Sequence, residues 1–146
     1  MVNLSKISEN LKELMAEHEI SQKELAEKLN TGRTKLSDIL GGKNAPSYNT
    51  FVALAEYFNC SADFLLGLDD YPHEDVAYAP VRPFCRSLRL LLEQSGTTVY
   101  AFQKGTKLSW SVIYGWLNGK TLPSCYNLAK VAAFFGCSAD CLLGRR

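Results

Sequence analysis

The octapeptide CSADFLLG at residues 60–67 returns as CSADCLLG at residues 137–144, at an offset of 77 residues. With this offset kept fixed, the two halves of the chain stay in register without a gap from Ile7 and Phe84 onward. The matched pairs include Leu11 with Leu88, Leu40 with Leu117, Gly42-Lys43 with Gly119-Lys120, and Pro46-Ser47 with Pro123-Ser124. A chain of 146 residues can form one domain or two small ones. The repeat favours two copies of one unit.

The first copy has the pattern of five short helices. Apolar residues recur at helical spacing from Leu4 to Leu14, which predicts an amphipathic opening helix. Ser21 is expected to cap a second helix, and Glu24, three residues later, to reach back and form a capping box. Asn30-Thr31-Gly32 predicts a tight turn, because Asn tolerates left-handed backbone. The later boundaries are Gly41-Gly42 at the end of the third helix and the caps Ser47 and Ser61 of the fourth and fifth.

The second copy predicts the same five helices. Its boundaries are Gly96 at the end of the first helix, Thr98 as the cap of the second, Ser109 at the start of the third, Asn118-Gly119 at its end, and Ser124 and Ser138 as caps of the last two. Neither copy has the alternating pattern of a strand. The expected fold class is therefore all-α.

The domain boundaries follow from the repeat and from composition. We assign residues 1–67 to a first domain, residues 68–82 to a linker and residues 83–146 to a second, divergent domain. The linker is acidic and contains Pro72 and Pro80. Its apolar side chains predict that it packs in part against a domain rather than forming a free tether; these are Tyr71, Val76, Tyr78 and Val81.

Charge is distributed unevenly, although the net charge of the chain is only +1. Residues 1–67 have a net charge of −2, residues 68–82 of −3 and residues 83–146 of +6. A basic C-terminal half suits a polyanionic partner.

An enzymatic function is not expected from the residues present. The chain has two histidines, His18 at the end of the first helix and His73 in the linker. We expect His18 to cap carbonyls there or to interact with the helix dipole. No Ser–His–Asp set, paired carboxylates or Gly-rich phosphate loop can be found. We therefore expect no catalytic residue, no cofactor and no small-molecule ligand.

The five cysteines are expected to be reduced thiols. Cys60 and Cys137 occupy equivalent positions among apolar residues, where a buried thiol fits. Cys137 and Cys141 are one helical turn apart, but Phe64 stands in the first copy where Cys141 stands in the second, and no histidine is near. We therefore expect no metal site.

No apolar run approaches the ~20 residues that a membrane-spanning helix needs. The N-terminus lacks a basic-then-apolar export signal. We expect a cytoplasmic chain without a membrane segment.

The first copy carries a family likeness. The segment ISQKELAEKL at residues 20–29 and the segment RTKLSDI at residues 33–39, followed by Gly42-Lys43 and Pro46-Ser47, resemble lambda repressor/Cro-type (xenobiotic-response-element-like) helix-turn-helix transcriptional regulators. The resemblance covers residues 7–67 almost completely. It implies two tandem five-helix lambda repressor-like domains in a sequence-specific regulator that binds double-stranded DNA, of prokaryotic or phage origin.

The resemblance also implies which residues meet DNA. Gln22, the first residue of the second helix, would lie near the DNA backbone and brace a base-reading side chain. The start of the third helix would face base edges, where Arg33 can bind guanine O6 and N7 and Asp38 can accept from a cytosine amine. Lys43 and Asn44 would hold phosphates and set the register. The complete set is Gln22, Gly32, Arg33, Thr34, Lys35, Ser37, Asp38, Lys43 and Asn44.

The second copy resembles the same family less closely. Gln103 replaces the small residue where the second and third helices cross, and Lys107 stands where Gly is usual. Trp110 occupies the position of Arg33. These three departures put the crossing geometry and the base reading of this copy in question.

Aromatic residues on the third helix of the second copy predict a contact surface. Trp116 is expected in the core, whereas Trp110 and Tyr114 are expected to face outward. The candidates for DNA contact or for a protein interface are Ser109, Trp110, Ser111, Tyr114 and Lys120. The candidates for phosphate contact also include Lys104, Lys107, Arg145 and Arg146.

Two arrangements are consistent with these patterns. The two halves could act as an intramolecular pseudo-dimer that reads unlike half-sites, or the first half could bind DNA while the second forms a homodimer. We slightly favour the homodimer, because Trp110 and Tyr114 suit a protein interface, although the basic charge of the second half argues against it. A different class of function is a protein-interaction or antitoxin-like module without DNA affinity, which the acidic balance of residues 1–67 supports.

Overall fold

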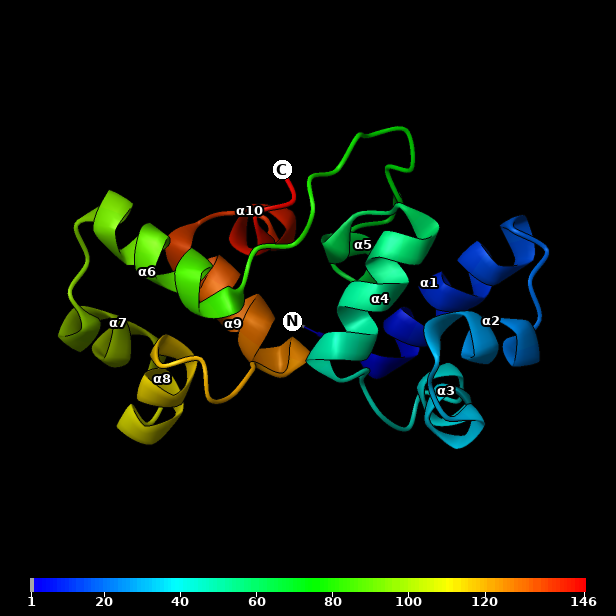
Figure 1. Cartoon of the computed structure of the whole chain (residues 1–146), viewed down its shortest axis with the longest axis horizontal. Helices are drawn as coiled ribbons and strands as arrows, with labels where there is room; N and C mark the ends of the chain where they lie inside the picture. Colours follow the sequence, from blue (N-terminus) through cyan, green and yellow to red (C-terminus); the bar gives the residue numbers. More distant parts are fainter. Residues whose placement is uncertain (1) are drawn as a thin grey trace. The chain divides into compact units, whose positions relative to one another are not determined.

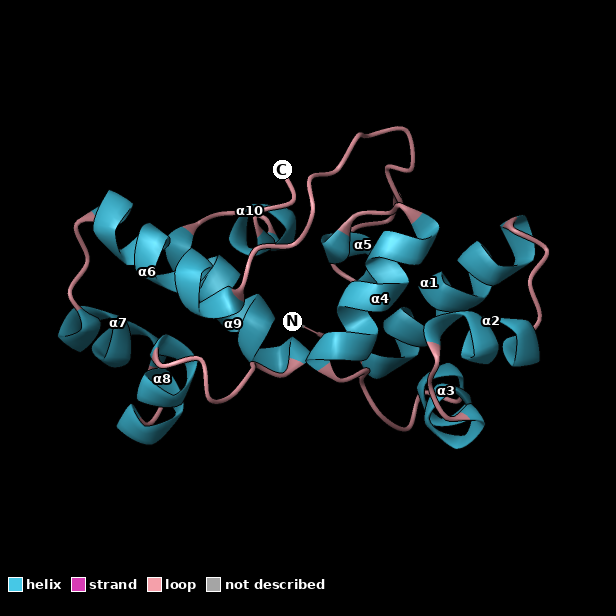
Figure 2. Cartoon of the chain, in the orientation of Figure 1, coloured by secondary structure: helices cyan, strands magenta, loops and turns pink. Residues whose placement is uncertain are grey.

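A computed structural model describes residues 2–146, where ten helices are joined by turns and loops and no strand occurs (Figures 1 and 2). The chain divides into two compact units, Met1–Ala77 (unit 1) and Tyr78–Arg146 (unit 2). Each unit contains five helices. The prediction of an all-helical chain built from two five-helix copies is confirmed.

Unit 1 is a small helical domain around an apolar core. Its helices are α1 (Leu4–Glu17), α2 (Gln22–Leu29), α3 (Arg33–Leu40), α4 (Tyr48–Phe58) and α5 (Ala62–Leu65). α1 packs against α3 and α5, and α2 packs against α3 and α4. The centre of the core is formed by side chains that have no exposed surface, including Leu11, Leu14, Leu25, Leu36, Phe51 and Phe64.

Serine caps fix the starts of three helices in unit 1. The hydroxyl oxygens of Ser21, Ser47 and Ser61 each accept a hydrogen bond from the backbone N–H three residues later. The capping box at Ser21 differs from the expected one. The Ser21 hydroxyl donates to the carboxylate of Glu24 at 3.1 Å, so Glu24 reaches the side chain of the cap rather than its backbone N–H.

Unit 2 repeats this architecture. Its helices are α6 (Phe84–Ser95), α7 (Val99–Thr106), α8 (Trp110–Leu117), α9 (Cys125–Phe135) and α10 (Ala139–Leu143). The caps Thr98, Ser109, Ser124 and Ser138 lie where the sequence predicts them. Trp116 is 2% exposed and meets the ring of Phe84 edge-on, so it belongs to the core as expected.

Arg145 is not available for phosphate contact, and the prediction that placed it at the nucleic-acid surface is wrong. Its side chain is buried and pairs with the carboxylate of Asp140 at 2.7 Å. Its guanidinium also lies over the ring of Tyr78, 4.2 Å from the centroid. A buried carboxylate strongly favours a paired cation, so Arg145 stabilises the interior of unit 2.

The segment between the helical parts of the two units is held at both ends. In unit 1 the amide of Asn59 donates to the carbonyls of Glu74 and Val76, at 2.9 and 3.0 Å. In unit 2 the N–H of Ala79 donates to the Arg145 carbonyl and the N–H of Arg82 to the Leu143 carbonyl. The chain before Ala77 therefore packs with unit 1, and the chain after it packs with unit 2.

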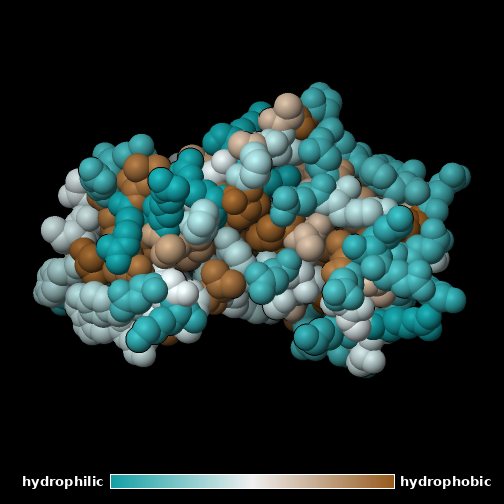
Figure 3. All heavy atoms as spheres, viewed as in Figure 1, coloured by the Kyte–Doolittle hydropathy of each residue, from teal (hydrophilic) through white to brown (hydrophobic). Residues whose placement is uncertain are grey.

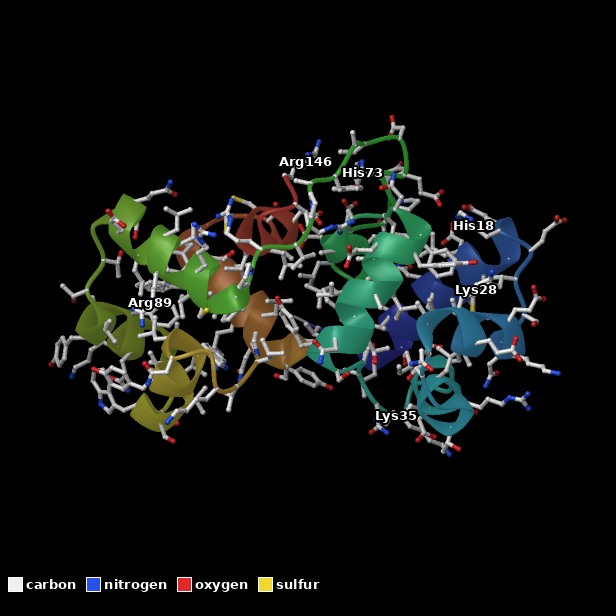
Figure 4. The ribbon with its side chains drawn as sticks, in the orientation of Figure 1. His18, Lys28, Lys35, His73, Arg89 and Arg146 are labelled. Carbon is white, nitrogen blue, oxygen red and sulfur yellow. The ribbon has the colours of Figure 1, made fainter. Side chains whose placement is uncertain are left out.

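Both histidines pair with carboxylates of this segment (Figure 4). The ring of His18 contacts Glu74, and the ring of His73 contacts Asp69 at 2.9 Å. His18 is the C-cap residue of α1, and its side chain pairs with Glu74 rather than with carbonyls of the helix end. The expected carbonyl cap is therefore wrong, and the interaction with the helix dipole stays a prediction. Burial alone would raise the pKa of Asp69. Hydrogen bonds from the Tyr71 N–H and from the His73 ring lower it by more than burial raises it, so the pKa of Asp69 is below its usual value.

None of the five cysteines is in a disulfide. Cys60 and Cys125 are buried, whereas Cys137, expected to be buried like Cys60, is only half-buried. Over residues 2–146, no group of three or more His, Cys, Asp or Glu side chains is placed to hold a metal ion. In the same part of the chain, no helix has both the length and the apolar character to cross a membrane.

Candidate nucleic-acid interface

A three-residue turn sets α3 at an angle to α2. Asn30 ends α2 in the left-handed conformation, with φ of 52°, as its residue type predicts. The N–H of Thr31 then donates to the Ala26 carbonyl at 3.0 Å. Gly32 is the N-cap of α3 and makes no side-chain cap. The N-cap of α3 is therefore an exposed residue without a side chain.

One face of α3 is buried and the other is free. Leu36, Ile39 and Leu40 turn inward. The exposed residues are Arg33, Thr34, Lys35 and Ser37, and Figure 4 shows Lys35 on this helix. Ser37 is four residues from Arg33 and three from Thr34, so these three share a face at the leading end of the helix, and Lys35 is exposed beside that face.

The remaining predicted residues flank this surface. Gln22 is the first residue of α2 and is half-buried, as is Asp38 on α3. The carbonyl of Asp38 accepts from the N–H groups of Lys43 and Asn44, at 2.9 and 3.4 Å. This loop leaves Lys43 and Asn44 exposed.

The end of α3 is tied to the first helix by a buried hydrogen bond. The hydroxyl of Ser8, which is 5% exposed, donates to the carbonyl of Leu40. In unit 2 the equivalent carbonyl, that of Leu117, accepts from the guanidinium of Arg89 at 2.8 and 3.2 Å. The two copies therefore anchor α3 and α8 at the same point with different side chains.

The turn before α8 keeps the left-handed residue of its counterpart despite the changed sequence. Lys107 ends α7 with φ of 60°, in the left-handed region that Asn30 occupies in unit 1. The amide of Gln103 donates to the carbonyl of Leu108 at 3.1 Å. α7 and α8 pack together less closely than α2 and α3 do, so the helix crossing of unit 1 is not fully preserved in unit 2. The N–H of Lys120 closes the following loop on the Gly115 carbonyl at 2.9 Å, as Lys43 does on Asp38.

The outer face of α8 is aromatic. Trp110 and Tyr114 are 40% and 49% exposed, and their rings stack with centroids 6.0 Å apart. Ser109 caps the helix, and Ser111 and Lys120 are exposed. A third ring, Tyr100 of α7, lies 6.4 Å from Trp110 and continues the row. Tyr100 was not among the predicted residues, although its equivalence to the exposed Lys23 in the repeat indicates that it faces outward.

The two outer surfaces differ in chemistry. In Figure 3, hydrophilic side chains dominate the visible surface over α1 to α3, whereas side chains of intermediate hydropathy gather over α7 and α8. The unit 1 surface offers hydrogen-bond donors and acceptors at the start of α3, in a helix-turn-helix arrangement.

Comparisons with known proteins agree with this geometry. Residues 11–65 match the family described as "Helix-turn-helix", and residues 87–144 match the family described as "Cro/C1-type HTH DNA-binding domain". The HTH-type transcriptional regulator ImmR of Bacillus subtilis (strain 168) is 38% identical over 64 residues, which is 44% of this chain and 50% of that protein. The chain therefore spans half the length of this relative. No solved structure matches the chain.

Proposed function

We propose that this chain, which belongs to the Cro/C1-type helix-turn-helix family and carries two copies of its domain, is a transcriptional regulator that binds double-stranded DNA in a sequence-specific manner. The observation that carries the proposal is the leading end of α3, where Arg33, Thr34 and Lys35 are all exposed. The similarity to a transcriptional regulator over the matched 64 residues supports the same function.

In the proposed mechanism α3 enters the major groove. Arg33 binds guanine O6 and N7 with two hydrogen bonds, and Asp38 accepts from a cytosine amine. Gln22 lies at the edge of the groove and braces a reading side chain. Lys43 and Asn44 bind phosphates, which fixes the register of the helix without reading sequence. Occupancy of the site then blocks or recruits the polymerase.

The second unit completes the proposal in one of two ways. As the second half of an intramolecular pseudo-dimer it would bind its own half-site, and as a dimerisation domain it would bring two copies of unit 1 to a symmetric site. The two arrangements differ in the sites they select. A pseudo-dimer selects two unlike halves, and a homodimer selects a palindrome.

The test is selection from random duplexes with the whole chain and with Arg33→Ala. The intact chain should enrich one site, and Arg33→Ala should weaken binding to it by roughly 10- to 100-fold, because one bidentate contact to guanine is lost. Arg33→Lys is the matched control, since it keeps the charge but loses the two-point contact. Equal weak binding to every duplex would remove the sequence-reading role of α3.

An interaction module without DNA affinity is the second candidate. The observation that favours it is the acidic character of unit 1, where residues 1–77 contain seven Lys/Arg and thirteen Asp/Glu. In that case the chain would enrich no duplex, and the changes Gln22→Ala and Arg33→Ala would leave binding to the protein partner intact.

A further inference from the structure

Unit 2 has less polar side chains at most of the positions that carry the reading surface in unit 1, although Thr34 corresponds to the polar Ser111. With the fixed offset of 77 residues, the side chains of unit 1 correspond to smaller or less polar ones in unit 2. The pairs are Gln22 with Val99, Lys23 with Tyr100, Arg33 with Trp110, Lys35 with Val112, Ser37 with Tyr114 and Asp38 with Gly115. The change is consistent across two helices, so it describes a surface with a different chemistry rather than a single substitution.

Residues around this surface, which we call its rim, have instead gained positive charge. Glu27 of unit 1 corresponds to Lys104, and Asn30 corresponds to Lys107, while the lysine at Lys43 is retained as Lys120. Lys104, Lys107 and Lys120 are all exposed, and the Lys104 ammonium lies 5.4 Å from the centroid of the Tyr100 ring. Lys104 therefore lies directly against the apolar rings, and Lys107 and Lys120 lie in the turn before α8 and in the loop after it.

This charge pattern argues against a symmetric dimer through α8. In a two-fold interface the same patch meets itself, so the rim lysines of one copy would lie against those of the other. Unit 2 has little acid to compensate, because its two side-chain carboxylates are Glu93 on α6 and the buried Asp140. The negative charge of a polyanion complements the rim lysines. If the lysines bind phosphates of DNA, the rings face the bases between those phosphates.

We propose that α8 reads thymine in the major groove, with Trp110 and Tyr114 packed against the C5-methyl groups and Lys104, Lys107 and Lys120 on the flanking phosphates. The methyl group is the apolar feature that base pairs present in this groove. The inference rests on the proposed function and deepens it. The chain becomes a pseudo-dimer with unlike half-sites, one read by hydrogen bonds from α3 and the other by apolar contact from α8.

The experiment replaces thymine by deoxyuridine, which removes only the methyl group. The whole chain is tested on its selected duplex, with the substitution made in one half-site at a time. The α8 half-site should lose about fourfold in affinity for each methyl group contacted, the value expected for one buried carbon. The same substitution in the α3 half-site serves as the internal control for general effects of uracil.

Two variants assign the effect to the ring. Trp110→Ala should bind thymine and uracil duplexes equally well, because the contact that senses the methyl group is gone. Trp110→Phe keeps an aromatic ring and should retain most of the discrimination. The exposed position of Trp110 makes either variant compatible with folding, and the fluorescence of the buried Trp116 reports whether unit 2 remains intact.

The outcomes that would overturn the thymine reading differ from those that would overturn DNA binding. A chain that selects a specific duplex but binds its uracil form with unchanged affinity refutes the thymine reading and leaves the proposed function standing. The thymine reading is also refuted if Trp110→Ala keeps the discrimination, or if the intact chain is a dimer in solution that Trp110→Ala converts to monomers. A chain that selects no duplex refutes both proposals.

Discussion

The left-handed residue between the second and third helices is Asn30 in unit 1 and Lys107 in unit 2, with φ of 52° and 60°. Asn enters this region readily, because its short polar side chain bonds locally. A lysine has no such compensation, and the left-handed conformation costs an ordinary residue roughly 1–2 kcal/mol. At this turn, unit 2 therefore carries a local strain that unit 1 avoids.

The change Lys107→Asn should relieve this strain and raise the free energy of unfolding of unit 2 by roughly 0.5–1 kcal/mol. Urea unfolding followed by tryptophan fluorescence measures it selectively, since both tryptophans of the chain lie in unit 2. The reciprocal change Asn30→Lys should destabilise unit 1 by a similar amount, followed by circular dichroism. An unchanged midpoint for both variants would show that the turn is not strained.

The buried thiol of Cys125 should make unit 2 sensitive to alkali. Burial raises the pKa of Cys125 to about 12 from an ordinary value of 9.0. Below pH 9 the thiol is protonated in the folded and unfolded states, so it adds no pH dependence. Above pH 9 the unfolded chain loses the proton first, and stability falls by up to about 1.4 kcal/mol per pH unit until the folded pKa is passed.

The variant Cys125→Ala should therefore lose less stability than the intact chain between pH 8 and 10, although its absolute stability is lower. Urea midpoints of tryptophan fluorescence at a series of pH values give the comparison. Cys141→Ala, which changes an exposed thiol, is the control for the lysines and tyrosines that titrate in every variant. Parallel curves for Cys125→Ala and the intact chain would refute the assignment.

The burial of Arg145 could not be predicted from the sequence. Its position at the basic C-terminus predicts a solvated cation, but Asp140, five residues earlier, is buried and requires a partner. Unit 1 has Asp63 at the position equivalent to Asp140 and Leu68 at the position equivalent to Arg145, so the repeat does not predict the ion pair. Only the folded position of the Asp140 carboxylate reveals it.

At the scale of elements, local signals predict the helices almost completely. Most boundaries follow from a capping hydroxyl, a left-handed Asn or a Gly, and these act within four residues of the chain. Contacts between distant residues could not be predicted in this way. Examples are the pairing of His18 with Glu74 and the bond from Ser8 to the Leu40 carbonyl, which depend on how whole helices meet.

The carbonyl at the end of the reading helix provides a test of such long-range contacts. Arg89→Leu should destabilise unit 2 by about 1–2 kcal/mol, because the Leu117 carbonyl loses its charged donor in a buried place. The matched control is Lys12→Leu, since Lys12 stands at the equivalent position of unit 1, where Ser8 supplies the donor instead. Urea unfolding of both variants measures the two losses of stability.

Ser8→Ala should show the converse pattern, with a similar loss in unit 1, while Cys85→Ala at the equivalent position of unit 2 should leave the Leu117 carbonyl with its donor. If Arg89→Leu and Lys12→Leu had equal effects, the guanidinium bond would not be what holds α8 to α6.

At the scale of the whole molecule, sequence likeness and charge point to different halves. The reading motif is closer to its family in unit 1, yet residues 78–146 carry nine Lys/Arg and two Asp/Glu, against seven and thirteen in residues 1–77. Sequence-independent affinity for DNA comes mainly from phosphate contacts. We therefore expect unit 2 to contribute most of the affinity and the polar surface of α3 to contribute hydrogen-bonded selectivity.

The salt dependence of binding to a random duplex separates these contributions. Each phosphate contact adds about 0.9 to the slope of log affinity against log salt concentration. Lys120→Ala and Lys43→Ala, which change equivalent residues of the two units, should each lower the slope by about that amount if both units lie on DNA. Lys12→Ala, on the first helix of unit 1 and outside the proposed interface, is the control. A slope that falls for Lys43→Ala but not for Lys120→Ala would show that Lys120 does not contact DNA, because a lysine that touches no phosphate releases no counterion. That result would contradict the proposed DNA contact of unit 2.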